Sequence, residues 1–401
     1  MFLSASGRVV SACDEHQFTG RTRFLKNRCG LRPAFTLGLA VAFGAALAGC
    51  TGRNAPATTA SPSSSPRAMA LTLAERGKID VLVRRTMAQQ HLAGLSLAIA
   101  QGGVILYARG YGYRDVGRRL PVEANTIYNI ASMSKQFTAA CVLLLQQDGK
   151  LSLDDPLSKY LPQLRHTQGV TLARMLNHTS GMPDYLDLID NNHLSYPKIM
   201  AALENAPLKF APGTRFEYSN TNYALMGPVV RQASGMPFDE FVTRRIIEPL
   251  HLGSTSVGTT PIDLPNGAAG YTVVKGKTVP AVPQDAAQLD FPDGGVNSTV
   301  VDLVAWDTAL DSGQVLGAGF TRRMMTPGPY ERYPGVRYGF GLDIASLDGH
   351  REIYHQGEWT GYAGENATFP DNRFDVILLS NTDGFDEEPL VRQIYKALNP
   401  T

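Results

Sequence analysis

The sequence of 401 residues lacks several features that would assign a function class directly. It has no excess of charge, because 37 basic and 36 acidic side chains leave a net charge of +1. A chain without a basic surplus has no electrostatic field to attract nucleic acid. It also has no glycine-rich phosphate loop and no H-E-x-x-H metal motif. These absences exclude nucleic acid as a partner and lead us to expect neither a cofactor nor a metal.

Cysteine is also scarce, and one of the four cysteines ends an unusual N-terminal segment. A charge-free run of 16 residues, Ala34–Gly49, follows a basic stretch, as in secretory signals. The run is shorter than the roughly 20 apolar residues of a membrane-spanning helix. Its ending, Leu-Ala-Gly-Cys, resembles the lipobox of bacterial lipoproteins, in which the cysteine is lipidated. The alternative is an ordinary signal with a chance cysteine.

We therefore predict a lipoprotein signal peptide over residues 1–49 and lipidation of Cys50. The lipid would anchor an exported protein to a bacterial membrane, facing the periplasm or the cell exterior. Residues 50–70 are rich in proline, serine, threonine and alanine, and this composition predicts a flexible tether.

The chain becomes globular from Leu71 onward. Apolar residues at helical spacing predict a helix over 71–90. Residues 95–100 and 104–108 are predicted to be two strands joined at Gly102-Gly103, a hairpin signal. Helical segments follow as far as about Pro292. The last part returns to predicted strands and a final helix, at 338–344, 352–357, 365–369, 374–380 and 387–398.

This order of elements predicts an α+β fold with antiparallel hairpins. We expect a sheet domain formed by residues 71–125 and 293–401. A mostly helical domain, residues 126–292, would be inserted between its two halves.

A serine and a lysine stand three residues apart at the start of an apolar helix. Residues i and i+3 share a helix face, so Ser132 Oγ and Lys135 Nζ can meet as nucleophile and base. Burial disfavours an ammonium group, and a neutral amine can accept a proton. The pattern S-x-x-K is weak alone, since Ser195-x-x-Lys198 also matches. There Pro197 favours a helix start, so we interpret Ser195 as an N-cap.

A second pattern, Tyr218-Ser219-Asn220, is the only Y-x-N in the chain. In extended backbone, residues i and i+2 point the same way, so the phenol and the amide can face one pocket. Tyr218 would move a proton and Asn220 would hold a substrate amide or carbonyl. Considered alone, the segment is better explained as a cap of the next helix. Pro228 should bend or shorten that helix.

A third pattern, His355-Gln356-Gly357, lies at the end of a predicted strand. Glycine at a strand end allows a ligand or another backbone to approach closely. A backbone N–H at such a place can stabilise an oxyanion. We interpret another histidine, His178, as a turn or helix-end residue because Thr179, Ser180 and Gly181 follow it.

Together and in this order, the three motifs resemble the serine β-lactamase and penicillin-binding protein superfamily, in its class C-like branch. That branch also contains DD-peptidases, D-aminopeptidases and esterases. The resemblance extends from about Leu71 to Leu398. It implies an α/β sandwich of the β-lactamase/transpeptidase type, in which N- and C-terminal helices flank an antiparallel sheet of five or more strands.

The resemblance also implies an acyl-enzyme mechanism without a cofactor. Ser132, activated by Lys135 and Tyr218, would attack a carbonyl group. The backbone N–H groups of Ser132 and Glu358 would bind the oxyanion. The other substrate-binding residues implied by the motifs are Asn220, His355 and Gly357.

The third motif departs from that of the β-lactamases in this group, which is Lys-Thr-Gly; this chain has no K-x-G. His355 has at most a partial positive charge near neutral pH, so we expect it to bind the carboxylate of a β-lactam weakly. We therefore expect a serine hydrolase that acts on an ester or a D-amino-acid peptide, and less efficiently on a β-lactam. The alternative is a lipoprotein that binds penicillin or cell wall, or senses them, without turnover.

Overall fold

The structure, a computed structural model, describes residues 70–189, 194–282 and 291–399. The predicted signal peptide and Cys50 lie outside these residues, as does the predicted tether except for its last residue. Within the described ranges, no helix combines the length and the apolar character needed to cross a membrane. All the described residues belong to one compact unit. The finer division into a sheet domain and a helical domain stays a prediction.

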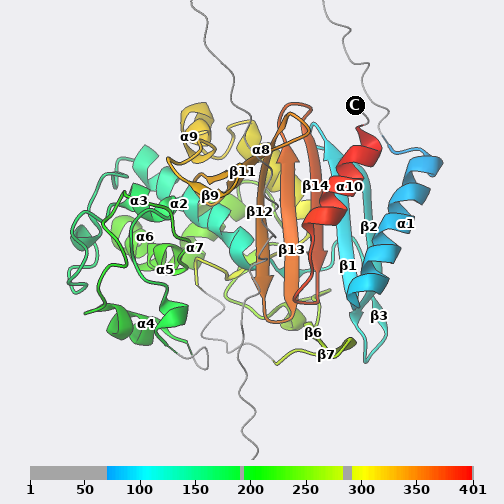
Figure 1. The fold of residues 1–401 in the computed structure, drawn as a ribbon, viewed down its shortest axis with the longest axis horizontal. Coiled ribbons are helices and arrows are strands. Elements are labelled where there is room, and N and C mark those ends of the chain that lie inside the picture. Colours follow the sequence, from blue (N-terminus) through cyan, green and yellow to red (C-terminus); the bar gives the residue numbers. More distant parts are fainter. Residues whose placement is uncertain (1–69, 190–193, 283–290, 400–401) are drawn as a thin grey trace, which may run out of the picture. The chain divides into compact units, whose positions relative to one another are not determined.

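A nine-stranded antiparallel sheet organises this unit (Figure 1). The strand order is β3-β2-β1-β14-β13-β12-β11-β10-β9. The predicted antiparallel sheet of five or more strands is therefore confirmed. Its strands are β1 (Gly94–Gln101), β2 (Val104–Asp115), β3 (Leu120–Pro121), β9 (Glu331–Tyr333), β10 (Val336–Tyr338), β11 (Asp343–Leu347), β12 (His350–Trp359), β13 (Tyr362–Phe369) and β14 (Phe374–Ser380).

One predicted strand, 338–344, is wrong, because a turn interrupts it between β10 and β11. Gly341 has φ +74°, in the left-handed region that favours glycine. A Cβ atom at this position would lie 2.6 Å from the backbone oxygen of Lys135. The two strands are thus separated where the chain turns against the helix that carries Lys135.

Alternate residues of β1 face two different apolar cores. Leu95, Leu97 and Ile99 pack with helices α1 (Leu73–Gln90) and α10 (Glu388–Leu398), which lie next to each other over the sheet in Figure 1. Ala98 and Ala100 belong to the core on the other face. Small side chains on that face let helix α8 (Val300–Asp311) pack closely against the sheet, and helix α2 (Ser134–Gln147) contributes to the same core. The predicted flanking of the sheet by the N- and C-terminal helices is confirmed.

Short helices and small strands fill the segment between β3 and β9. The short helices are α3 (Leu172–Leu176), α4 (Tyr196–Leu203), α5 (Thr221–Ala224), α6 (Met226–Ser234), α7 (Phe238–Val242) and α9 (Gly317–Met324), with single turns η1 (Ala131–Met133), η2 (Leu157–Lys159), η3 (Tyr185–Asp187), η4 (Thr243–Ile247) and η5 (Pro261–Asp263). Strands β4 (Tyr128–Asn129), β8 (Val296–Ser298) and β5 (Ser256–Val257) form a small sheet, and β6 (Tyr271–Val274) pairs with β7 (Lys277–Pro280).

Pro228 shortens the helix that follows Tyr218, as the sequence predicts. The helix is divided into α5 and α6 at Leu225. A proline lacks the N–H that would bond to the carbonyl four residues earlier, here that of Ala224. The Tyr196 hydroxyl donates to this carbonyl instead, at 3.1 Å. The break ends the first helix just beyond Asn220.

A buried carboxyl in β13 makes the stability of this fold depend on pH. Glu365 is 1% exposed, and Gln356 Nε2 donates to it at 3.0 Å. Burial raises the pKa of Glu365 from its usual 4.5 to about 8. Between these two pH values the folded chain keeps a proton that the unfolded chain releases. The stabilising contribution is therefore full at low pH and is lost as the pH rises.

We expect Glu365→Gln to weaken this pH dependence, because the amide keeps the shape of the neutral acid and cannot ionise. Between about pH 5 and pH 8, the free energy of unfolding should fall less steeply than in the wild type, by about 1 kcal/mol per pH unit. Urea unfolding across this range measures the slope. Glu331→Gln, at an exposed position in β9, is the control and should keep the wild-type slope. An unchanged slope in Glu365→Gln would contradict the prediction.

Candidate active site

Ser132 lies in η1, the single turn that leads into α2. The residue before it, Ala131, has φ +47°, a left-handed conformation that is uncommon for a residue other than glycine. The backbone N–H of Ala131 donates to Asn129 Oδ1 at 2.9 Å, and Asn129 Nδ2 donates to the carbonyl of Gly294 at 3.1 Å. These contacts hold the strained turn in place, and with it the position of Ser132.

Lys135 Nζ joins three segments that are far apart in the sequence. It lies 2.9 Å from Ser132 Oγ, 3.0 Å from Asn220 Oδ1 and 2.8 Å from the backbone oxygen of Asp293. The side chain is fully buried. Three acceptors match the three hydrogens of an ammonium group. The structure thus brings together the serine and lysine of the first motif and the asparagine of the second.

A carboxylate that the motifs do not include orients Asn220. Asp184 Oδ2 accepts from the backbone N–H of Asn220 at 2.9 Å and from its Nδ2 at 3.0 Å. Although Asn220 is the N-cap residue of α5, its side chain makes no capping bond. Because Nδ2 is engaged by Asp184, the amide oxygen is turned toward Lys135. Nothing in the sequence marks Asp184, which lies in a loop before the single turn η3.

Tyr218 is held through its ring. The ring stacks on that of His178, with centroids 4.3 Å apart, and the Arg332 guanidinium lies 4.6 Å from the Tyr218 ring centroid. Lys135 Nζ is 5.2 Å from the same centroid. Within the described part of the chain, the Tyr218 hydroxyl makes no hydrogen bond to Ser132 or Lys135. The structure therefore places Tyr218 beside the lysine without connecting it to the serine.

His178 supports the loop that carries Tyr218 and Asn220. It follows α3 in a left-handed conformation, which agrees with its interpretation as a helix-end residue. The side chain is fully buried, and its Nδ1 accepts from the backbone N–H of Ser219 at 3.1 Å. Burial lowers the pKa of His178 well below its usual value, and the charge of Lys135 adds to this effect. A neutral, buried histidine thus positions the second motif, a role that the sequence did not reveal.

His355 is buried in β12, with 1% of its surface exposed. Its Nε2 lies 2.9 Å from the Tyr338 hydroxyl, and its Nδ1 lies 2.5 Å from the carbonyl of Gln356. Burial lowers the pKa of His355 well below 6.5, and the charges of Arg332 and Lys135 lower it further. The neutral ring can then donate from Nδ1 and accept at Nε2.

A partly buried arginine supplies positive charge near this histidine. Arg332 donates to Asp343 Oδ2 at 2.6 Å, and its side chain is 17% exposed. Burial opposes the charge, but Asp343 and the neighbouring tyrosines together outweigh that effect and raise the pKa of Arg332. Arg332 lies in the short hairpin of β9 and β10, which contains none of the three sequence motifs, so sequence reasoning missed it.

Gly357 lets β12 run against the backbone that precedes Ser132. A Cβ atom on Gly357 would lie 2.3 Å from the backbone oxygen of Ile130, closer than any real contact. Glu358 follows on the same strand with its side chain exposed, and its Oε1 accepts from the backbone N–H of Gly384 at 3.0 Å. The missing side chain of Gly357 therefore brings this part of β12 next to the serine turn.

A small cavity opens at Ser132. The residues that line it are Ala131, Ser132, Tyr185, Asn220, Phe291, Asp293, Gly294 and Trp359. Of the seven residues that the sequence assigns to catalysis or substrate binding, Ser132 and Asn220 line this cavity. Lys135 and His355 are buried and are not among its lining residues.

The beta-lactamase family model matches residues 79–399 of this chain. Penicillin-binding protein 4* of Bacillus subtilis (strain 168) is 30% identical over 317 residues, which cover 74% of this chain and 70% of that protein. The chain also matches protein flp of Staphylococcus aureus (strain COL), of which it spans about half, 49%.

Solved structures show the same relationship. The octameric penicillin-binding protein homologue from Pyrococcus abyssi superposes with a TM-score of 0.74 at 29% identity, covering 80% of this chain and 77% of that one. The D-amino acid amidase from Ochrobactrum anthropi SV3, complexed with D-phenylalanine, gives a TM-score of 0.70 at 25% identity, covering 81% and 99%.

The close approach at Gly357 gives a prediction for stability. Gly357→Ala should destabilise the protein by about 1–3 kcal/mol, because the added methyl group meets backbone that cannot move aside easily. Gly319→Ala is the matched control. Gly319 lies in α9, and a Cβ atom added there would meet nothing within 4 Å. Alanine at this position should therefore leave the stability unchanged or increase it. Chemical denaturation of both variants measures the difference. If Gly357→Ala were as stable as Gly319→Ala, β12 would not press against the serine turn.

Proposed function

The chain belongs to the beta-lactamase family, and from this membership we propose that it is a serine hydrolase that forms an acyl-enzyme on Ser132. Family membership and the likeness to penicillin-binding proteins and a D-amino acid amidase support hydrolase activity. The observation that carries the finer proposal is the 2.9 Å contact between Lys135 Nζ and Ser132 Oγ at a fully buried lysine.

The surroundings of Lys135 suit a general base. A neutral amine has two N–H groups, which can donate to Asn220 Oδ1 and to the backbone oxygen of Asp293. The nitrogen lone pair is then directed at the remaining neighbour, the Ser132 hydroxyl. In the proposed step the proton of Ser132 moves to Lys135 as Oγ bonds to the substrate carbonyl carbon.

The negative charge that develops on the carbonyl oxygen needs donors. We assign this role to the backbone N–H groups of Ser132 and Glu358. The close approach of Gly357 to the backbone just before Ser132 supports this assignment. The bond to the leaving group then breaks, and the leaving group takes the proton from Lys135, directly or through the Tyr218 hydroxyl. Water then attacks the acyl-enzyme, with Lys135 again taking the proton and returning it to Ser132 Oγ. This step releases the acid and restores Ser132.

The cavity favours an uncharged or weakly anionic substrate. Tyr185, Phe291 and Trp359 supply aromatic walls next to Ser132. His355 is neutral and buried, and Arg332 is engaged with Asp343, so neither offers an open cation for a substrate carboxylate. We therefore propose an ester, or an amide or peptide of a D-residue, ahead of efficient β-lactam hydrolysis.

A second candidate is a penicillin-binding or cell-wall-sensing protein that is acylated but does not turn over. The penicillin-binding proteins among the relatives favour this alternative. For both candidates we propose export and attachment to a bacterial membrane through a lipid on Cys50.

The first test is the hydrolysis of a nitrophenyl ester. Ser132→Ala should lower kcat/KM by at least about 1,000-fold because the nucleophile is lost, and Lys135→Ala should have a similar effect because the base is lost. Ser195→Ala, in the second S-x-x-K match, is the control and should retain full activity. Circular dichroism checks that each variant folds. Wild-type activity in a folded Ser132→Ala would rule out the proposed nucleophile.

Intact-mass measurement after exposure to penicillin distinguishes the two candidates. A hydrolase should show an adduct on Ser132 that disappears once excess penicillin is removed. A protein without turnover should keep the adduct. Peptide mapping locates the modified residue, and Ser132→Ala should not be modified. A persistent adduct, together with no ester hydrolysis by the wild type, would favour the second candidate.

A further inference from the structure

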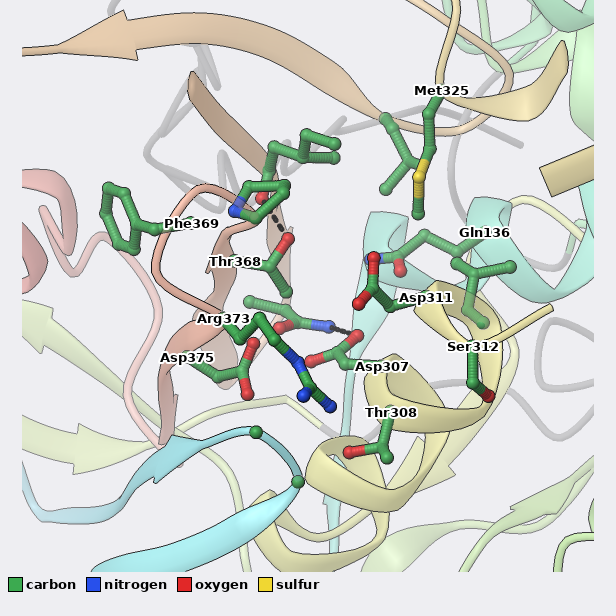
Figure 2. A pocket seen from close by; sticks show the side chains of 17 residues that line it. Gln136, Asp307, Thr308, Asp311, Ser312, Met325, Thr368, Phe369, Arg373 and Asp375 are labelled. Carbon is green, nitrogen blue, oxygen red and sulfur yellow. Dashed lines mark hydrogen bonds between the residues drawn. The ribbon is translucent and has the colours of Figure 1, made fainter. Parts of the chain in front are cut away.

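A larger cavity, of about 270 Å³, lies away from Ser132 (Figure 2). Its volume is close to the lower end of the range found for small-molecule sites. It is lined by residues of α8, by the turn between β13 and β14, by the β1–β2 turn and by Gln136 of α2. No residue that lines the Ser132 cavity also lines this one. The proposed serine chemistry leaves it unused.

Two buried polar side chains of this cavity have incomplete hydrogen bonding. Asp307, in α8, is 6% exposed, and Asn366, in β13, is 2% exposed. Asn366 Nδ2 donates to Asp307 Oδ1 at 2.8 Å. Asp307 Oδ2 and Asn366 Oδ1 have no partner among the described residues. Buried polar atoms are nearly always paired, so these two oxygens call for a hydrogen-bond donor.

The charges around these oxygens favour a cation. Asp311 and Asp375 also line the cavity, against one lining cation, Arg373. Figure 2 shows Asp307, Asp375 and Arg373 extending toward a common region. Burial raises the pKa of Asp307, and the charge of Asp375 raises it further; burial also raises the pKa of Asp375. Burial and mutual repulsion therefore favour the protonated carboxyls, and a bound cation would allow them to ionise.

The cation that fits is organic. The described residues contain no group of three histidine, cysteine, aspartate or glutamate side chains that could hold a metal ion. Apolar side chains also line the cavity and would accept a short hydrocarbon body: Leu310, Met325, Leu342 and Ile353. A primary ammonium has three hydrogens, enough to donate to Asp307, Asn366 and Asp375 together.

We propose that this cavity is a binding site for a small primary ammonium compound with a short apolar body. Asp307 Oδ2 and Asn366 Oδ1 accept from the ammonium group, Asp375 adds a second carboxylate, and the aliphatic walls cover the hydrocarbon part. The site does not depend on the proposed serine chemistry, because its residues take no part in it.

Isothermal titration calorimetry of the full chain with pentylammonium tests the site, with 1-pentanol and pentanoate as probes of the same length. Pentylammonium should bind at least about tenfold more tightly than either, because only pentylammonium brings a positive charge to the carboxylates. A tenfold difference in affinity corresponds to about 1.4 kcal/mol of binding free energy. Asp307→Asn should remove most of this preference, because it deletes the charge and keeps the shape. Asp375→Asn should act in the same direction. Arg373→Gln should tighten binding of pentylammonium, because it removes a competing cation.

Asp239→Asn, at an exposed position in α7, is the matched control and should bind all three probes as the wild type does. Thermal unfolding of each variant checks its fold. The proposal is overturned if pentanol binds as tightly as pentylammonium, since the cavity would then be merely apolar. It is also overturned if no probe binds, or if folded Asp307→Asn and Asp375→Asn keep the wild-type affinity for pentylammonium.

Discussion

The rest of the site depends on one buried amino group. Lys135 Nζ contacts Ser132 on the turn before its own helix, Asn220 on a loop and Asp293 on a third segment. A buried nitrogen that can be charged must have its hydrogens accepted, so these segments cannot move apart without leaving a costly unpaired group. Asp184 and His178 then fix the loop of Asn220, and Asn129 fixes the turn of Ser132. The geometry of the site follows from satisfying this one group.

The fold was largely predictable from the sequence because its signals are local. Short apolar segments marked β1, β12, β13 and β14, and the 3.6-residue period marked the helix at the start of the compact unit. The prediction of a strand at 338–344 was wrong because of a contact in the tertiary structure. Its glycines were read as part of a strand, whereas Gly341 turns against the backbone of Lys135. A contact between segments so far apart leaves no local pattern.

The site was predictable only where residues recur at short spacing. Ser132, Lys135 and Asn220 come together as their motifs suggested, but Asp184, Arg332 and the supporting role of His178 carry no such signal. Each acts through long-range contacts, among them a carboxylate on an amide, a guanidinium over a ring, and an imidazole stacked on a ring. The third motif shows the same limit. Sequence alone suggested a partly charged His355, whereas burial, reinforced by the charge of Arg332, lowers its pKa and favours the neutral ring.

The pairing of β1 with β14 has a consequence for how the chain reaches this structure. These strands lie side by side near the middle of the sheet, yet they come from opposite ends of the compact unit. During synthesis β1 must therefore wait for nearly all of the remaining residues before its partner exists. Contacts of such high sequence separation close slowly, because the entropy of a long loop is lost before the contacts form. Until β14 arrives, one edge of β1 has unpaired backbone groups, so the nascent chain is most prone to aggregate just before its last strand is added.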